Sequence, residues 1–305
     1  MAMNWNGKRK FTCLLRIVMN RLLLLLGLIV CQACAQKPWY GDLEYLGKLP
    51  SKLSEVSGIV ALEDKSLWVI EDNGNKDKLY QINLEGHLIR ESKVENGKNH
   101  DWEDIAKDIH GNIYIGNFGN NANDRKNLSI LKIDSKQGFG GEKVSAEKIK
   151  FEYPEQKKFP PKKKNLHFDC EAFFHHGNSL YLITKNRARP YTGKAFIYKV
   201  PDTPGSHKAK LVGEFITCTD SQFCSITGAD ISPDGKKIAL LGSGFIWLYT
   251  DFSFDDFSTG KVEVIDVLYR TQQESICFLD NETLLIADEQ SKTKGRNLYQ
   301  YKLQH

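Results

Sequence analysis

Acidic residues recur at fixed offsets before several short apolar segments of this chain. The most crowded stretch reads NHDWEDIAKD, from Asn99 to Asp108, and holds four carboxylates and one histidine. Acidic residues are poor strand formers, and like charges this close together repel. A solvated loop is one explanation of the stretch. The repetition of the pattern elsewhere in the chain favours another.

The repetition is visible when five segments are aligned on the apolar residue that begins each one: Ile59, Ile105, Phe173, Ile231 and Ile276. Two positions earlier stand Ser57, Glu103, Glu171, Ala229 and Glu274. Four positions earlier stand Glu55, Asp101, Asp169, Thr227 and Gln272. If the five segments are equivalent elements of a ring, these side chains converge on its axis.

Converging carboxylates need a counter-charge to stay ionised. A divalent cation would supply it, and a set of oxygen ligands suits Ca²⁺ better than Zn²⁺. The predicted calcium ligands are Glu55, Asp101, Glu103, Asp169, Glu171 and Glu274. Two alternatives stay open. The acids could cap strand amides or pair with Lys and Arg, or a metal-free ring could bind a cationic or polar ligand.

The segments that follow the second apolar run of several repeats are rich in Asn, Lys and Arg. We expect them to open on the same face as the acids and to bind a ligand that carries phosphate or carboxylate. The predicted ligand-binding residues are Asn117, Arg125, Lys185 and Arg187, with Arg189 and Arg296 nearby. Plain solvated loops are the alternative.

Three residues are candidates for catalysis. His100 and His167 precede the acidic leads of the second and third repeats, and either could act as a general base, as could Asp101. A structural, hydrogen-bonding histidine is the alternative. The sequence shows no nucleophile elbow, phosphate-binding loop or Gly-rich dinucleotide turn, so no particular reaction is indicated.

The elements that must position these residues are short strands. Each repeat contains a strand, a turn, a second strand, a third and in most cases a fourth, with apolar residues at period two. Four-stranded repeats of this length are typical of β-propeller blades. The sequence predicts an all-β propeller with five blades, six being possible from length alone. The strand from Asp42 to Leu49 is expected to complete the last blade, because an unpaired edge is a liability.

The first 35 residues differ from the rest. They contain five basic residues, no acid and the apolar run LLLLLGLIV, which together are typical of a secretory signal. We expect residues 1–35 to be a signal peptide and residues 36–305 a single exported propeller domain. Cleavage before Gln36 and lipidation of Cys34 both fit, so the protein would be periplasmic, secreted or anchored as a lipoprotein.

Removal of the signal changes the charge of the chain. The full sequence has a formal charge of +4, and without the five basic signal residues the charge becomes −1. Nucleic acid is therefore not an expected partner, and membrane contact is expected only through a lipid anchor at Cys34. The run KKFPPKKK, from Lys157 to Lys164, is interpreted as a solvated loop or a patch for an anionic partner.

Four cysteines lie beyond the signal. Cys218 and Cys224 flank a short polar stretch and could form a disulfide, which export permits. Cys170 and Cys277 sit in strand patterns and are expected to be buried thiols. None of the spacings resembles a zinc site.

The stretches DWEDIA, GNFGNN, DCEAFF, TGADISPDG and QQESICF resemble exported bacterial propellers known as phytase-like esterases and the related SdiA-regulated propellers. The resemblance covers roughly Glu55 to Glu289. It implies a propeller fold, export and a divalent-cation site, and the esterase label suggests phosphoester chemistry. The fourth repeat departs from the acidic pattern at Ala229.

Two functional classes follow. The first is a non-catalytic module that binds a small ligand or a cell-envelope partner over an acidic channel mouth. The second is a metal-assisted hydrolase that acts on ester or phosphoester bonds. The absence of a recognisable nucleophile favours the binding module.

We predict that the signal is missing from the exported protein. Mass spectrometry of the protein recovered from the cell envelope should find either a free N-terminus at Gln36 or a lipidated Cys34. A full-length chain that begins at Met1 or Met19 in that fraction would contradict both forms of the prediction.

Overall fold

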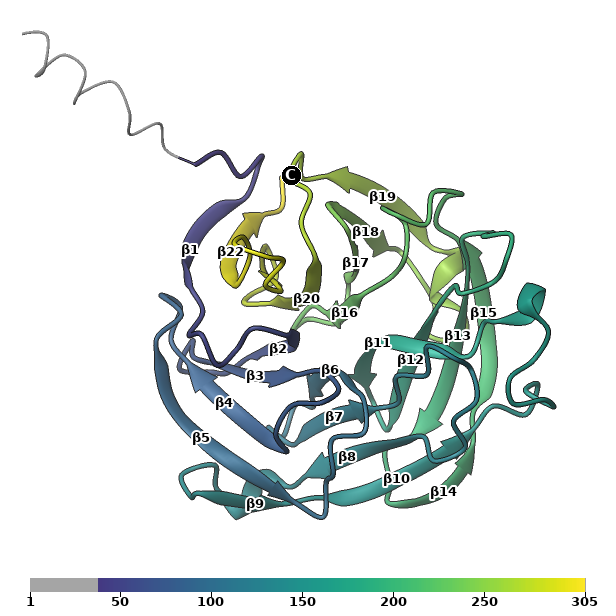
Figure 1. The fold of residues 1–305 in the computed structure, drawn as a ribbon, viewed down its shortest axis with the longest axis horizontal. Helices are drawn as coiled ribbons and strands as arrows, with labels where there is room; N and C mark the ends of the chain where they lie inside the picture. Colours follow the sequence, from purple (N-terminus) through teal and green to yellow (C-terminus); the bar gives the residue numbers. More distant parts are fainter. Residues whose placement is uncertain (1–37, 305) are drawn as a thin grey trace, which may run out of the picture. The chain divides into compact units, whose positions relative to one another are not determined.

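The computed structural model describes residues 38–304, and the predicted signal, with Cys34, lies outside this range. Five mainly antiparallel sheets surround a common centre in this range (Figure 1). The chain is a five-bladed β-propeller, as the sequence predicts.

Each blade is built from strands that follow one another from the centre outward. Blade 1 contains β2 (Val56–Ala61), β3 (Leu67–Glu71), β4 (Lys78–Ile82) and β5 (Leu88–Glu95). Blade 2 contains β6 (Trp102–Lys107), β7 (Ile113–Asn117), β8 (Ser129–Ile133) and β10 (Glu147–Glu152). Blade 3 contains β11 (Asp169–His176), β12 (Ser179–Lys185), β13 (Lys194–Pro201) and β15 (Lys210–Ile216). Blade 4 contains β16 (Gly228–Ile231), β17 (Ile238–Gly242), β18 (Phe245–Thr250) and β19 (Lys261–Asp266).

Blade 5 combines both ends of the described chain. Its strands β20 (Gln273–Phe278), β21 (Thr283–Asp288) and β22 (Asn297–Lys302) are followed on the outside by β1 (Glu44–Lys48). Strand β1 pairs antiparallel with β22, and the ladder is extended by the Leu49 amide, which donates to the Arg296 carbonyl at 2.7 Å. The predicted ring closure by Asp42–Leu49 is confirmed.

Two blades carry a fifth strand that the sequence analysis did not separate. Strand β9 (Lys143–Ser145) pairs in parallel with β5 of blade 1, and β14 (Gly205–Lys208) pairs in parallel with β10 of blade 2. Each short strand therefore covers the open edge of the preceding blade. Residues 38–304 also contain three single-turn 3₁₀ helices: η1 (Ser135–Gln137), η2 (Lys163–Asn165) and η3 (Phe257–Thr259).

The core of the propeller is divided among the spaces between blades. Five clusters of buried side chains each join one blade to the next around the ring. The innermost strands β2, β6, β11, β16 and β20 contact their neighbours in this circular order (Figure 1). Equivalent positions on these five strands therefore face a common axis.

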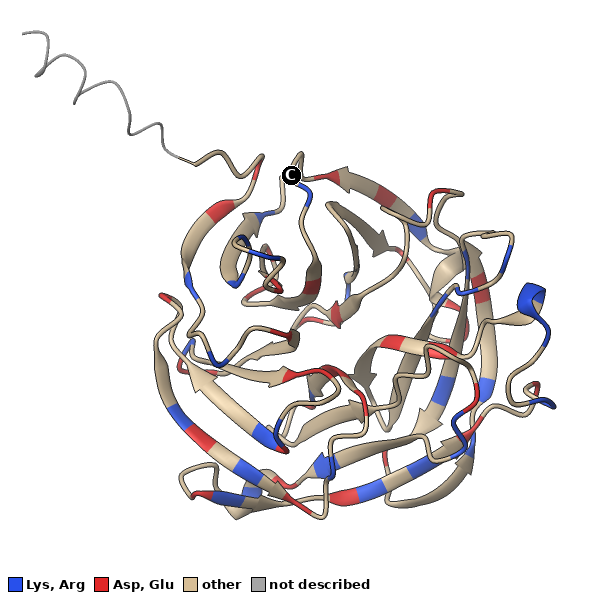
Figure 2. Ribbon diagram, viewed as in Figure 1, with Lys and Arg blue, Asp and Glu red and all other residues tan. Residues whose placement is uncertain are grey.

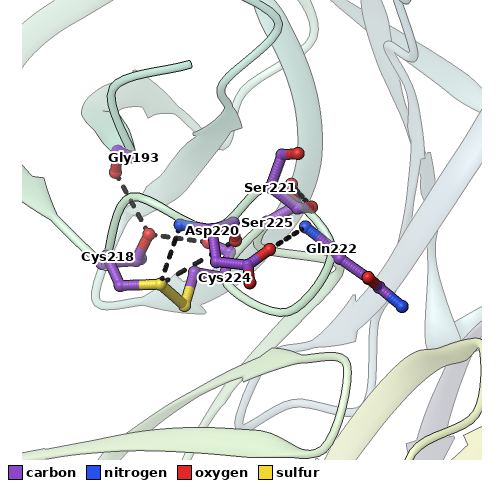
Figure 3. Close-up of a disulfide and its surroundings, with 8 residues drawn as sticks. Gly193, Cys218, Asp220, Ser221, Gln222, Cys224 and Ser225 are labelled. Carbon is purple, nitrogen blue, oxygen red and sulfur yellow. Dashed lines mark hydrogen bonds between the residues drawn. A yellow bond between two sulfur atoms is a disulfide. The ribbon is translucent and has the colours of Figure 1, made fainter.

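The structure contains the disulfide that the sequence allows and the two buried thiols that it predicts. Cys218 and Cys224 form a disulfide with a Cα–Cα distance of 5.6 Å, which closes a short loop after β15 (Figure 3). Cys170 and Cys277 are buried free thiols. Among residues 38–304, no helix has the length and apolar character that a membrane crossing needs.

We predict that β1 is required for the stability of the ring. A chain that begins at residue 50 should unfold at a lower urea concentration than a chain that begins at residue 38. The truncation exposes the edge of β22 and removes Leu43 and Leu49, which are 6% and 1% exposed. Loss of two buried leucines should lower the free energy of unfolding by about 3 kcal/mol or more. Equal urea midpoints for the two chains would contradict a closing role for β1.

Candidate functional site

A β-bulge occurs at the same place in four of the five innermost strands. The register shifts between Val56 and Gly58, Trp102 and Asp104, Cys170 and Ala172, and Gln273 and Ser275. The extra residues are Ser57, Glu103, Glu171 and Glu274. A bulge bends its strand and redirects the unpaired side chain. The bulges therefore turn equivalent side chains of four blades toward the axis, at the end of the channel where the innermost strands begin, here called the channel mouth.

Blade 4 lacks this bulge, and its register corrects the sequence alignment. Ala229 lies opposite the third residue of β17, just as Ile59 and Ile105 lie opposite the third residues of β3 and β7. The alignment on Ile231 is thus shifted by two residues, because the first hairpin turns of the blades differ in length.

Thr227 takes the place of the missing bulge residue in blade 4. Its hydroxyl donates to the Gln273 carbonyl at 2.8 Å, and the Ser57 hydroxyl donates to the Trp102 carbonyl at 2.8 Å. Both bonds reach the next blade around the ring. The two blades without a glutamate at this position therefore use a hydroxyl to join neighbouring blades.

The bulge residues surround a polar cavity of about 160 Å³ at the channel mouth, here called the acidic pocket. Its lining comprises Ser57, Asp72, Glu103, Asn121, Glu171, Lys185, Arg187, Thr227, Gln272, Glu274 and Glu289. Figure 2 shows acidic segments on the central strands around this position. Five carboxylates against two cationic side chains leave the lining with an excess of negative charge.

Two cationic side chains from blade 3 neutralise part of this charge. The Arg187 guanidinium donates to Asp169 at 2.5 Å and to Glu171 at 2.7 Å. The Lys185 ammonium lies 3.2 Å from the other Glu171 oxygen. Burial alone would raise the pKa of Glu171, but the charges of Lys185 and Arg187 outweigh it and hold that pKa below its usual value. Asp169 and Glu171 are therefore committed to internal ion pairs.

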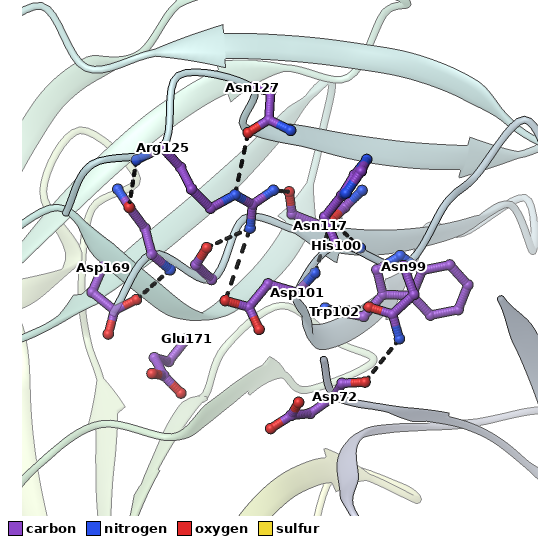
Figure 4. A network of polar contacts seen from close by, with 12 residues as sticks. Asp72, Asn99, His100, Asp101, Trp102, Asn117, Arg125, Asn127, Asp169 and Glu171 are labelled. Atoms are coloured by element: carbon purple, nitrogen blue, oxygen red, sulfur yellow. Dashed lines mark hydrogen bonds and ion pairs between the residues drawn. The ribbon is translucent and has the colours of Figure 1, made fainter. Parts of the chain in front are cut away.

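Arg125 and Asn117 have structural partners at the rim. The Arg125 guanidinium donates to the carbonyls of Gly119 and Asn117, and it lies 3.9 Å from Asp101 (Figure 4). The Asn117 side chain accepts from the amides of His100 and Asp101 and donates to the Lys98 carbonyl. Both side chains hold the chain around Asp101 in place and have few groups left for a ligand.

Glu103 is the one bulge glutamate that is deeply buried without a partner. It is 7% exposed and makes no hydrogen bond or ion pair with any residue in the described range 38–304. Burial, and then the charge of Glu171, raise its pKa well above the usual range. A Cβ atom at Gly119 would overlap the Glu103 carboxylate and crowd Asp101, so the loop after β7 approaches these acids only because Gly119 has no side chain.

Three more carboxyls of the acidic pocket also titrate near neutral pH. Burial, followed by the charge of Asp101, raises the pKa of Asp72 to about 7. Burial raises the pKa of Glu274 to about 7, although Lys185 opposes the shift. Burial and the charge of Glu274 raise the pKa of Glu289 to about 8. A cation bound among these carboxyls would favour their ionised forms and so release protons.

Asp72 and Glu289 were not among the residues chosen from sequence. They directly follow β3 and β21, so they lie at the start of the loops whose basic residues drew attention. The sequence could have indicated both residues, because the residue that follows the second strand of a blade lies at the channel mouth. Of the basic candidates, Lys185 and Arg187 line the acidic pocket, whereas Arg296 donates to the Leu49 carbonyl and Arg189 is exposed outside it.

The predicted calcium ligands do not form one free cluster. Glu55 is exposed and accepts from Asn75 at 2.7 Å, Asp101 faces Arg125, and Asp169 and Glu171 are bound by Arg187. Of these six predicted ligands, only Glu103 and Glu274 line the acidic pocket without a hydrogen bond or ion pair to another residue in the range 38–304. Within residues 38–304, no three Asp, Glu, His or Cys side chains are grouped so that they could hold a metal ion. The side-chain arrangement therefore does not fit the six-carboxylate calcium site.

Neither candidate histidine lines the acidic pocket. His100 is exposed and borders a different pocket on the outer part of blade 2. His167 contacts the Asn186 amide at 3.3 Å and meets the Phe196 ring edge to face at 5.3 Å. Burial lowers the pKa of His167. Of the three catalytic candidates, only Asp101 lies beside the acids at the mouth.

Comparison with known proteins shows the fold. A PQQ-bound aldose sugar dehydrogenase from Streptomyces coelicolor is similar in structure, with a TM-score of 0.50 and 10% sequence identity over 87% of this chain and 99% of that chain. Virginiamycin B lyase from Staphylococcus aureus matches with a TM-score of 0.41, 16% identity and coverage of 85% of this chain and 69% of that chain. A putative gluconolactonase matches with a TM-score of 0.44, 10% identity and coverage of 82% and 76%.

No family model matches the chain, and no curated protein matches it. At these low identities the structural neighbours establish a β-propeller and carry no activity over to this chain. The finer resemblance to phytase-like esterases and SdiA-regulated propellers is not shown by these comparisons.

We predict that the acidic pocket makes the ligand-free protein less stable as pH rises. A carboxyl whose pKa is higher in the folded than in the unfolded state binds more protons when folded, so the free energy of unfolding falls between the two pKa values. For Asp72, Glu274 and Glu289 that interval runs from about 4 to between 7 and 8.

Replacing Glu289 by Gln should remove one such titration. Thermal unfolding at pH 5 to 8 should show a flatter pH profile for Glu289→Gln and a gain of roughly 1 kcal/mol or more at pH 8. The control is Glu263→Gln, which changes an exposed carboxyl on β19. Parallel profiles for Glu289→Gln and the unmodified protein would refute the assignment.

Proposed function

We propose that the protein is an exported binding module whose acidic pocket takes a small organic cation such as a primary diamine. The observation that carries the proposal is the Glu103 carboxylate, which is buried, unpartnered within residues 38–304 and part of the pocket lining. An unpaired carboxylate in this position is costly unless it is protonated or meets a positive charge. An ammonium group would supply both the charge and the hydrogen-bond donors.

The size and chemistry of the acidic pocket support a compact ligand. Its volume of about 160 Å³ is well below the several hundred cubic ångströms of pockets for drug-sized molecules. Free carboxylates from blade 2, at Glu103, and from blade 5, at Glu274, lie around it and could receive two donor groups of one ligand. On the blade 3 side of the pocket, Lys185 and Arg187 form ion pairs with Glu171, so that carboxylate is not free to bind the ligand.

Calcium is the second candidate ligand. Glu103, Glu274, Asp72 and Glu289 supply oxygens of the kind that Ca²⁺ prefers. Within residues 38–304, however, no three such side chains are grouped closely enough to hold a metal ion, and Lys185 and Arg187 would have to release Glu171 before it could contribute. The diamine needs no such rearrangement. The hydrolase alternative lacks a histidine base at the pocket, so we place it behind both binding proposals.

The test is ligand-induced stabilisation. At pH 8, 1,4-diaminobutane should raise the thermal midpoint, with a gain of about 2.7 kcal/mol when the free ligand reaches a hundredfold excess over Kd. The neutral analogue 1,4-butanediol should give no gain. The diamine should bind more tightly at pH 8 than at pH 6, because its binding displaces protons from the pocket carboxyls.

Glu103→Gln should abolish most of the diamine effect while the protein stays folded, and Glu263→Gln should leave it unchanged. Calcium chloride, tested beside a chelator, separates the two ligands. If calcium stabilises the protein and the diamine does not, the ligand of the pocket is the metal and the diamine proposal is wrong. Absence of any effect from both cations would count against a cation-binding pocket.

A further inference from the structure

We propose that a basic groove along the outer strands of blades 2 and 3 binds a linear polysaccharide that carries carboxylate or sulfate groups. The groove consists of two neighbouring pockets of about 680 and 670 Å³, each several times larger than the acidic pocket. It shares no lining residue with the acidic pocket, so this inference is independent of the proposed diamine site.

The first pocket lies on blade 2 and is dominated by lysines. Its basic side chains are Lys126, Lys148, Lys150 and Lys208, against the single acid Glu152. Lys126 precedes β8, whereas the other three lysines lie on β10 and β14, where Lys150 pairs with Ser206 and Glu152 with Lys208 in the parallel ladder. Residues two apart on one strand point to the same side. Lys148 and Lys150 therefore place two ammonium groups along one face.

The second pocket lies between the KKFPPKKK loop and blade 3. Its lysines are Lys157, Lys158, Lys162, Lys164 and Lys194, and its one acid is Glu155. Lys194 also pairs with Glu214, outside the lining, at 2.6 Å. Figure 2 shows the basic segment at η2, beside the outer strands of blade 3. Phe196 and Leu211 add apolar surface to this pocket, and the neighbouring Phe159 is 39% exposed.

Side chains around the two pockets contact one another at the surface and below it. The Lys126 ammonium, which lines the first pocket, lies 5.0 Å from the ring centroid of Phe159 in the loop beside the second. Beneath them, the Tyr153 ring connects Phe151 of the first floor to Phe168 of the second, with centroid distances of 5.4 and 5.5 Å. A chain-like ligand could therefore occupy both pockets at once.

The concentration of charge points to a polyanion. Nine lysines and two glutamates line the two pockets, whereas the chain without its predicted signal has a formal charge of −1. Like charges gathered in a concave surface raise the local potential and attract a ligand of opposite sign. The KKFPPKKK run is thus one side of a larger basic surface that only the fold assembles.

The kind of polyanion follows from the other side chains. The described lining of both pockets contains no arginine, although arginine is the residue that reads phosphate bidentately. Amide and hydroxyl groups at Asn127, Ser129, Ser206 and Thr192 stand between the lysines and suit sugar hydroxyls. Single ammonium charges interleaved with such groups match an acidic polysaccharide better than a nucleic acid, and a concave site suits a chain better than a flat membrane.

The test uses the purified protein and two end-labelled probes, an oligogalacturonate and a sulfated dextran oligomer, followed by fluorescence anisotropy at low salt. At least one acidic glycan should bind, and raising the salt to the physiological level should weaken it, because screening acts on exposed charges. Lys148→Gln with Lys150→Gln, and separately Lys157→Gln with Lys164→Gln, should each weaken binding about fivefold or more.

The matched control is Lys236→Gln with Lys302→Gln, which changes two exposed lysines outside the groove and should leave binding unchanged. A neutral galacto-oligosaccharide should not compete. The proposal is overturned if neither acidic glycan binds, or if the groove variants bind as well as the control. Tighter binding of oligo-deoxythymidine or of phosphatidylglycerol vesicles than of the glycans would also overturn it. Retention of glycan binding by Glu103→Gln would show that the two sites are separate.

Discussion

The β-bulge at the start of the innermost strands is the constraint on which the channel mouth depends. In four of these strands one extra residue is left out of the hydrogen-bonded ladder, and its position in the ring places it near the axis. Without the bulge, the alternation of a strand would leave successive side chains on its two faces. With it, Glu103 faces the acidic pocket while Asp104 points into the ring below. Adjacent acids thereby acquire opposite environments.

Asp104 illustrates the second environment. Its carboxylate is fully buried and accepts from the amides of Ile105 at 2.8 Å, Phe173 at 3.0 Å and Ala229 at 3.3 Å. These amides belong to blades 2, 3 and 4, so one side chain ties three blades together across the axis. Asp230 repeats the device with the amides of Ile231 and Phe278. The acids below the mouth are satisfied by backbone donors, whereas at the mouth Asp169 and Glu171 are ion-paired and Glu103 and Glu274 are not.

The positive and negative side chains lie in different parts of the molecule, although the formal net charge without the predicted signal is close to zero. Carboxylates gather at the channel mouth, and lysines gather along the outer strands of blades 2 and 3. The internal pairs of Arg187 and Lys185 with Asp169 and Glu171 lower the repulsion at the mouth without abolishing it. Burial raises the pKa of the remaining acids, so the charge at the mouth depends on pH.

The sequence by itself predicted the propeller, five blades as the favoured count and the closing strand, because these follow from strand period, repeat spacing and the need to pair an open edge. It allowed the disulfide, because Cys218 and Cys224 are only six residues apart. It also indicated that Glu103, Glu171 and Glu274 converge, since equal offsets in equivalent strands must meet on the axis. The register in blade 4 could not be read from it, because the hairpin turns differ in length and no local signal marks a missing bulge.

The partners of the acids were decided only by the tertiary structure. Whether a carboxylate meets Arg187, Arg125, a backbone amide or nothing depends on how the loop after the second strand folds back over the first strand of its blade, and on contacts between blades, neither of which is visible in the local sequence. For the same reason, sequence showed eight residues of the basic loop but not the lysines of β10 and β14 beside it. The acidic pocket and the basic groove therefore depend on how the blades and loops pack, which composition does not indicate.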